Sequence, residues 1–167
     1  MDCFYEQLVE AHKSQKYIVA KAAVIIFAIL ALLGLFTGNI FVCGFGVIIS
    51  VLTFFLKQKL YIEYEYEFTN GDIDIDAIYE KKKRTRIMSF SIRDIELLAP
   101  EDSEVVKGFS NKPESIKKLY PNGTDKKIYV AMVTGGTYRL QLRFTPDERF
   151  IDCCYKYNPR AVKKNNY

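Results

Sequence analysis

Histidine is almost missing from this sequence of 167 residues, and its scarcity removes several classes of enzyme. The single histidine, His12, would have to serve any Ser-His-Asp or Cys-His catalytic site, and metal sites that need several histidines are excluded. No glycine-rich phosphate-binding loop occurs either. The sequence therefore predicts a protein that is not an enzyme, and it indicates no residue that would bind a cofactor or a metal ion.

Cysteine is also scarce, and the spacing of the four cysteines matches no recognisable disulfide or metal-binding pattern. No C-x-x-C pair is present, and the adjacent Cys153 and Cys154 are too close in sequence to pair readily with each other. Cys3 lies near the start of the chain and Cys43 lies in an apolar run. This usage favours a reducing compartment, with a redox-sensing vicinal pair as the alternative.

Charge is missing from one long stretch, because residues 22–56 contain no Asp, Glu, Lys or Arg. As a single helix this run would be roughly 52 Å long, much more than the hydrocarbon core of about 30 Å. Gly38 and Asn39 interrupt it, which predicts two membrane spans, Ile18–Thr37 and Ile40–Leu56. The alternative is a buried helical hairpin in a soluble protein.

Lysines flank both predicted spans and are missing from the turn between them. They are Lys13, Lys16 and Lys21 before the first span, and Lys57 and Lys59 after the second. The positive-inside rule then predicts a cell-membrane protein with both termini in the cytoplasm. The chain after the second span is accordingly expected to form a cytoplasmic domain.

Small residues recur at a spacing of four in both spans. Gly34 and Gly38 form a G-x-x-x-G pattern, and Gly46 with Ser50 repeats the small-x-x-x-small spacing. Such spacing lets two helices approach closely. We expect these four residues to pack the internal hairpin, with a homodimer face and chance occurrence as the alternatives.

Two hairpins can be read from turn residues in the second half of the chain. Apolar and acidic residues alternate from Leu60 to Phe68, and Asn70-Gly71 is a strong signal for a two-residue turn. That turn predicts the apolar pairs Phe68–Ile73, Tyr66–Ile75 and Tyr64–Ala77, and the acidic pairs Glu67–Asp74 and Glu65–Asp76. A Gly135-Gly136 turn predicts the pairs Val133–Tyr138, Ala131–Leu140 and Tyr129–Leu142.

The remaining elements are shorter. We expect strands through Met88–Ile92 and Ile95–Leu97, and helical turns capped by Asn111. A closing helix is predicted with Thr145 as N-cap, Pro146 in its first turn, and an apolar face of Phe150, Ile151, Cys154 and Tyr155. Phe4, Leu8 and Ala11 suggest an interfacial amphipathic helix at the start of the chain. A mainly-β barrel or sandwich with a C-terminal helix follows from this order.

The chain resembles the bacterial pleckstrin-homology-like (PH-like) domains of membrane-anchored proteins. The resemblance rests on two spans followed by "YEYEFTNGDIDIDAI", "FSIRDIELL" and a closing helix. Within that group it is similar to a two-span family from Gram-positive bacteria, although the insertion 102–124 departs from the minimal pattern. The resemblance implies the fold and no catalytic residue. The elements predicted from the residues divide the chain into an interfacial segment (1–17), a transmembrane hairpin (18–57), a cytoplasmic PH-like domain (58–158) and a basic, frayed tail (159–167).

A ladder of acids on the first hairpin is followed directly by the basic run "KKKRTR". Carboxylates that face each other across strands repel, so we expect the bases to neutralise them through ion pairs, with a divalent metal ion as the weaker alternative. The same bases would face anionic membrane lipids. The residues predicted to face lipid are Lys81, Lys82, Lys83, Arg84, Arg86, Lys163 and Lys164. Nucleic acid is not expected, because the net charge is only +4 and no nucleic-acid-binding motif is present.

The sequence thus favours a non-enzymatic, membrane-tethered binding or scaffolding module. The alternative is an accessory subunit of a larger membrane complex, with the β domain as its docking domain. Its protein partner is not identified by any motif.

Overall fold

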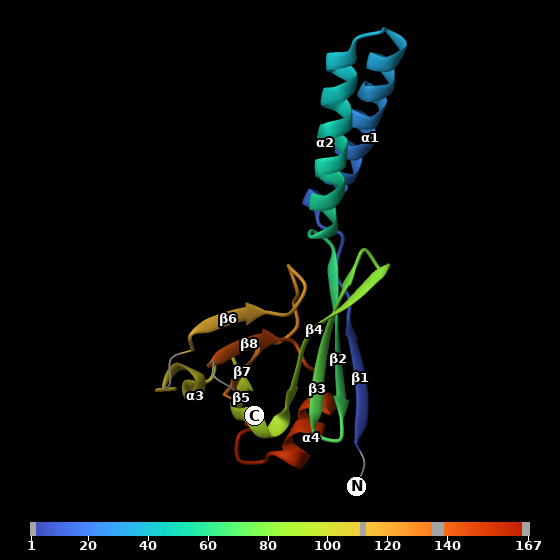
Figure 1. Ribbon diagram of the computed structural model, residues 1–167. Helices are drawn as coiled ribbons and strands as arrows, with labels where there is room; N and C mark the ends of the chain where they lie inside the picture. The colour runs from blue at the N-terminus through green and yellow to red at the C-terminus, as the bar shows by residue number, and fades with distance from the viewer. Residues whose placement is uncertain (1–2, 111–112, 135–138, 165–167) are drawn as a thin grey trace.

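The structure is a computed structural model that describes residues 3–110, 113–134 and 139–164. A pair of long antiparallel helices projects from one end of a β domain, and both ends of the described chain lie at the other end of that domain (Figure 1). The fold class predicted from the sequence, a helical hairpin plus a mainly-β domain with a C-terminal helix, is confirmed.

The helical hairpin consists of α1 (Gln15–Phe36) and α2 (Ile40–Gln58). Ser14 and Asn39 cap the two helices by accepting hydrogen bonds from main-chain N–H groups, each at 3.2 Å. Both helices are long and apolar enough to cross a membrane, and only 11% of the most apolar window of each is buried. A helix in the core of a soluble protein would be mostly buried, and these two helices are not buried within this chain.

The segment before α1 is a β-strand, so the prediction of an interfacial helix was wrong. Strand β1 (Phe4–Val9) pairs with the strand that follows α2. Gln7 and Val9 point into the domain with at most 7% of their surface exposed, whereas Phe4 and Leu8 face outward. The helical interpretation relied on Phe4 and Leu8, which turn out to be the exposed members of a period-two pattern.

Sheet A is antiparallel in the order β1-β2-β3-β4, with β2 (Ile62–Thr69), β3 (Asp72–Tyr79) and β4 (Lys83–Ser91). The β2–β3 register is the one predicted from the Asn70-Gly71 turn, including the pairs Tyr66–Ile75 and Glu65–Asp76. Asn70 and Gly71 have φ of 52° and 107°. Positive φ at both positions is what the two-residue hairpin turn requires.

Sheet B has the order β5-β7-β8-β6, with β5 (Ile95–Pro100), β7 (Tyr129–Val133), β8 (Leu140–Phe144) and β6 (Ser115–Lys118). The predicted β7–β8 register is wrong by two residues, because Val133 faces Leu140 and Ala131 faces Leu142. Gly135-Gly136, the predicted turn, lies outside the described residues. A shift of two residues keeps every side chain on its face, so the inward-facing set was still identified.

Strand β6 replaces the helical turns predicted near Asn111, which itself lies outside the described residues. It pairs in parallel with β8 and is exposed along its length. The short helices α3 (Glu104–Lys107) and η1 (Ile92–Asp94) complete the connections. The two sheets form separate four-stranded layers among the described residues, so the domain is not a closed barrel.

Helix α4 (Glu148–Tyr157) packs against sheet A and η1. Its N-cap is Asp147 rather than Thr145, and the Asp147 carboxylate accepts from the N–H of Phe150 at 2.9 Å. Phe150 is fully buried against Tyr66, Phe68 and Phe144 in edge-to-face contacts. Tyr155, expected in the core, is 40% exposed.

The chain after α4 is not frayed over its described part. Ala161 and Val162 are buried, and the segment forms a parallel bridge and two main-chain hydrogen bonds with Leu98 of β5. This corrects the prediction of a frayed tail. The physical reason is that two small apolar residues cover an otherwise open strand edge.

Candidate site at the base of the helical hairpin

The turn between β3 and β4 lies beside the base of the two helices (Figure 1). Glu80 occupies this turn with φ of 50°, and its carboxylate accepts a hydrogen bond from the Tyr17 hydroxyl of α1 at 3.0 Å. The same carboxylate forms an ion pair with Lys57 of α2. Burial alone would raise the pKa of Glu80, but Lys57 and Tyr17 hold that pKa below its usual value. Glu80 therefore joins the β domain to both helices.

Three lysines follow Glu80 and are exposed. The ammonium of Lys81 lies 3.3 Å from the Glu63 carboxylate, which raises the pKa of Lys81. Lys82 and Lys83 make no ion pair with any residue that the structure describes. Of the basic run, these two side chains have the most freedom to meet an external anion.

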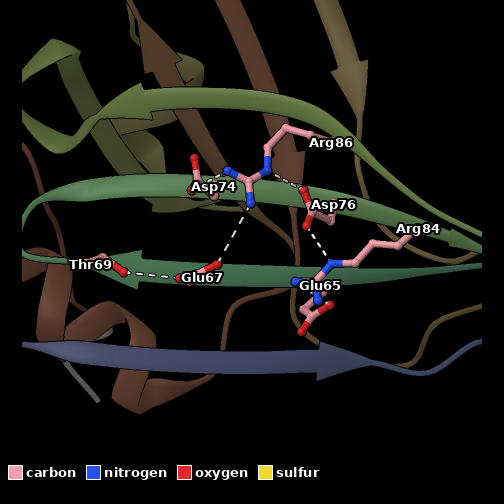
Figure 2. Close-up of polar contacts among 7 residues, drawn as sticks. All are labelled: Glu65, Glu67, Thr69, Asp74, Asp76, Arg84 and Arg86. Atoms are coloured by element: carbon pink, nitrogen blue, oxygen red, sulfur yellow. Dashed lines mark hydrogen bonds and ion pairs between the residues drawn. The ribbon is translucent and has the colours of Figure 1, made fainter.

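Arg84 and Arg86 neutralise the acidic ladder (Figure 2). The Nε atoms of both arginines lie 2.6 Å from the carboxylate of Asp76. Arg84 also contacts Glu65 at 2.9 Å, and Arg86 contacts Asp74 at 2.5 Å. The predicted neutralisation by ion pairs is confirmed, and it engages both guanidinium groups with the protein itself.

A β-bulge places these arginines on the acidic face. Ile75 faces Met88, but the next residue, Asp76, faces Arg86, so Ile87 is the extra residue in β4. In a regular strand, residues two apart share a face, so Arg86 would lie on the face of Met88. The bulge at Ile87 moves Arg86 to the acidic face. An apolar residue, Met88, and a charged residue, Arg86, are two positions apart, where a regular strand would place both side chains on one face. That mismatch is the signal that could have revealed the bulge.

The acids of the ladder are largely buried. Glu63, Glu65 and Asp76 are only 2%, 6% and 4% exposed, so they do not form a solvated outer face. Burial, together with a hydrogen bond shared with Glu6, raises the pKa of Glu65 to about 7, although the charge of Arg84 acts in the opposite direction. Burial also acts to raise the pKa of Asp76, but its bonds to the two arginines keep that pKa below the usual value.

The two remaining residues that were predicted to face lipid, Lys163 and Lys164, lie elsewhere. The described C-terminal end of the chain is at the end of the β domain that is remote from the helices (Figure 1). Lys164 pairs with Asp152 at 2.5 Å, and the ammonium of Lys163 donates to the main-chain oxygen of Arg160 at 3.0 Å. The structure therefore does not bring the tail lysines together with Lys81, Lys82 and Lys83.

The small residues of the helices have two different roles. A Cβ atom on Gly34 would lie 2.4 Å from the main-chain nitrogen of Cys43, and one on Gly46 would lie 2.7 Å from that of Ala31. The Ser50 hydroxyl donates to the main-chain oxygen of Val24 at 3.1 Å. Gly38 instead lies in the turn with φ of +69° and has no neighbouring atom within 4 Å of its Cβ position.

Cys3 and Cys153 are paired as a disulfide in the structure, with their Cα atoms 6.4 Å apart. The pairing links the segment just before β1 to α4, and it differs from the unpaired cysteines expected from the sequence. Sequence reasoning considered only Cys153 with its neighbour Cys154, because the position of Cys3 depends on β1, which was not predicted. Cys154 is buried, and burial raises the pKa of its thiol.

No group of three or more His, Cys, Asp or Glu side chains that could hold a metal ion occurs among residues 3–110, 113–134 and 139–164.

Two sheets and a closing helix define a PH-like domain, and here the domain carries an apolar helical hairpin between its first and second strands. The family model "Bacterial PH-like domain (DUF6106)" matches residues 1–164, and the chain belongs to this family. No curated protein and no solved structure matches it. The resemblance to a two-span family of Gram-positive bacteria stays a prediction.

Proposed function

We propose that this protein is a membrane-anchored, non-enzymatic binding or scaffolding module. Its helical hairpin crosses the cell membrane, and its PH-like domain rests against the inner leaflet. The exposed apolar side chains along both helices support the crossing, because a surface of that kind is stable only when lipid or protein covers it. The pairing of β1 with β2 supports a two-span arrangement, because it holds the segments before α1 and after α2 on the same side.

The observation that carries this proposal is the position of Glu80. Its bonds to Tyr17 near the start of α1 and to Lys57 near the end of α2 fix the β3–β4 turn at the level where the apolar helices end. The lysines that follow Glu80 then lie at head-group height. Each Lys or Arg near an anionic leaflet contributes about 1 kcal/mol of attraction.

The orientation gives the first prediction. Lysines flank both helices and the turn between them has none, so a peptide tag at either terminus should be protected from protease in intact cells. Permeabilised cells, in which both tags should be cleaved, are the control. Cleavage of either tag from outside intact cells would contradict the proposal.

The lipid contact gives the second prediction. In the full-length protein in nanodiscs, the amides of the β3–β4 turn should exchange hydrogen more slowly with anionic lipid than with neutral lipid. Added salt should reduce the difference, because exposed charges are screened over about 8 Å at physiological ionic strength. Hydrogen-exchange mass spectrometry measures it.

The matched control for this experiment uses lysines at the remote end of the domain. Changing Lys81, Lys82 and Lys83 to glutamine should abolish the lipid-dependent protection, whereas changing Lys156, Lys163 and Lys164 to glutamine should not. Equal protection in neutral and anionic lipid would show that the turn is only a solvated loop. The full chain is needed, because a fragment that begins at Leu60 lacks β1.

The polar groups of the helices bear on the alternative role as an accessory subunit. The hydroxyl of Ser50 bonds across the hairpin to α1, the hydroxyl of Thr37 bonds to Leu33 within α1, and Asn39 caps α2. Ser50 thus bonds across the hairpin, and Thr37 and Asn39 satisfy the ends of their own helices. Polar groups that are satisfied within the hairpin favour the anchor.

A further inference from the structure

A cleft of about 680 Å³ lies beside the start of α1. The segment between β6 and β7, part of which lines it, lies on the other side of the hairpin base from the β3–β4 turn (Figure 1). The walls of the cleft come from three parts of the chain that are far apart in sequence: residues 11–16, residues 59–64 and residues 118–123. In Figure 1 the segment between β6 and β7 rises from the β domain toward the helices and forms one of these walls.

Each of the three walls contributes one lysine. Lys16 lies in the first turn of α1, Lys59 directly follows α2, and Lys118 ends β6. All three are exposed, and none makes an ion pair with a described residue. No aspartate or glutamate is among the residues that line the cleft. Three cations therefore surround one cavity without an internal counter-ion.

This charge distribution separates the cleft from the other basic surfaces of the protein. Lys81, Arg84 and Arg86 contact carboxylates of sheet A. The cleft that runs beside β1 contains lysines too, but it is also lined by acids, among them Glu6 and Asp147. A cleft at the remote end of the domain also has lysines and neutral side chains in its lining, but Lys164 there pairs with Asp152 and Lys163 donates to the main-chain oxygen of Arg160. The cleft at the helix base differs because none of its three lysines has such a bond to a residue that the structure describes.

The neutral lining residues suit the oxygens of a phosphate group. Ser14, Tyr120 and Asn122 carry hydroxyl or amide groups that can donate hydrogen bonds, and His12 lies beside them. Ammonium groups bind phosphate as point charges, and neutral donors add direction to that attraction. Lys16 lies in the first turn of α1 and Lys59 directly follows α2, so both lie at the base of the apolar hairpin. In the proposed placement, a cleft at this base lies at the depth of a lipid phosphate.

We infer that this cleft binds the phosphate of one anionic phospholipid head group. The inference rests on the proposed placement of the domain against the inner leaflet. A free phosphate ester has the same chemistry and is the alternative source of the ligand. The cleft would make lipid binding saturable and selective, whereas the β3–β4 turn provides only diffuse attraction.

Native mass spectrometry of the full-length protein, released from detergent after addition of phosphatidylglycerol or phosphatidylcholine, tests the inference. One phosphatidylglycerol should be retained per chain in preference to phosphatidylcholine. Lys16→Gln, Lys59→Gln and Lys118→Gln together should weaken this retention about a hundredfold, from roughly fivefold for each lysine lost. Lys118→Gln alone, which changes no residue of the helices, should weaken it about fivefold.

The matched control is the triple change of Lys81, Lys82 and Lys83 to glutamine, which removes the same charge on the other flank and should leave the retained lipid in place. Loss of retention in that control but not in the cleft variants would overturn the inference and leave the proposed function standing. Equal retention of both lipids by every variant would overturn the inference, whereas the proposed function is decided separately by the protection of the terminal tags. Displacement of phosphatidylglycerol by glycerol phosphate at similar concentration would assign the cleft to free phosphate esters instead of lipid.

Discussion

Glu65 and Asp76 lie opposite each other on neighbouring strands, yet the protein shifts their pKa values in opposite directions. Asp76 accepts from two arginines, which keep its carboxylate ionised despite burial. Glu65 is buried beside Glu6 and has only one arginine, so its protonated form is favoured. The second arginine, which contacts Asp76 and not Glu65, thus decides which of the two acids carries charge near neutral pH.

The third prediction concerns the pH dependence of stability. Because the pKa of Glu65 is raised to about 7, the folded protein keeps a proton that the unfolded chain releases above about pH 4.5. The free energy of unfolding should therefore fall as pH rises from about 4.5 to about 7, by on the order of 1 to 3 kcal/mol. Glu65→Gln should flatten this slope in denaturant titrations of the full-length protein in micelles.

Glu67 provides the control for that slope. The slope is assigned to Glu65 if Glu65→Gln flattens it and Glu67→Gln, which removes a more exposed acid 3.9 Å from Arg86, does not. Asp76 acts in the other direction and at lower pH, since its ionised form stabilises the fold until pH falls through its lowered pKa. A slope that persists in Glu65→Gln would assign the titration to another group.

The fourth prediction concerns Tyr66, whose ring packs in the core while its hydroxyl donates to the main-chain oxygen of Leu119 at 2.5 Å. The same hydroxyl accepts from the N–H of Thr145 at 3.3 Å. Tyr66→Phe keeps the ring and leaves two buried polar groups without this partner, which should cost about 1 to 3 kcal/mol of unfolding free energy. Tyr155→Phe, at an exposed position, should cost almost nothing in the same denaturant titration.

At the scale of elements, the helical hairpin depends on close contact at two glycines. A side chain at Gly46 would collide with the backbone of α1, whereas Gly44, two residues earlier on α2, has no atom within 4 Å of its Cβ position. The fifth prediction is therefore that Gly46→Leu forces the two helices apart and lowers resistance to unfolding by SDS. Gly44→Leu should behave like the unchanged protein, and equal damage from both would mean that α1 and α2 do not pack through Gly46.

Elements whose partners are close in sequence could be predicted, and those with distant partners could not. The helices and the β2–β3 hairpin follow from composition and from the Asn70-Gly71 turn, which act locally. Strand β1 pairs with β2, and strand β6 pairs with β8, in each case across a long stretch of intervening chain. No hairpin turn that could be recognised in the sequence connects either pair. The two-residue error at β7–β8 arose because Gly135-Gly136 permits loops of several lengths and does not fix one register.

The features of the candidate site also fall into those that the sequence could predict and those that it could not. The ion pairs of the acidic ladder could be predicted, because like charges on facing strands require neutralisation. The lysine cleft could not, because Lys16, Lys59 and Lys118 converge only through the folded arrangement of three segments. Nor could the sequence show that the tail lies at the end of the β domain that is remote from the helices.

At the scale of the whole molecule, the β domain is discontinuous, because its first strand precedes the helices and the rest follows them. Val9 of β1 is fully buried against this later part. A fragment that begins at Leu60 should therefore expose core residues and aggregate. A variant in which a short linker replaces α1 and α2 should fold as a soluble domain, because Val9 and Tyr64 already face each other across β1 and β2.

Dispersed amide resonances in the nuclear magnetic resonance spectrum of the linker variant, and their loss in the fragment, would check this sixth prediction. A fragment from Leu60 that folds without β1 would show that the first strand is dispensable.

This interrupted order also ties the biogenesis of the protein to its folding. During translation β1 emerges first and must wait, unpaired, until both helices and β2 have been made. If only one helix were inserted across the bilayer, β1 and β2 would lie on opposite sides of the membrane. Sheet A would then lack its edge strand. If the hairpin crosses the membrane as proposed, completion of the sheet shows that both helices were inserted correctly. A chain inserted wrongly would then present an open strand edge and an incomplete core to cellular proteases.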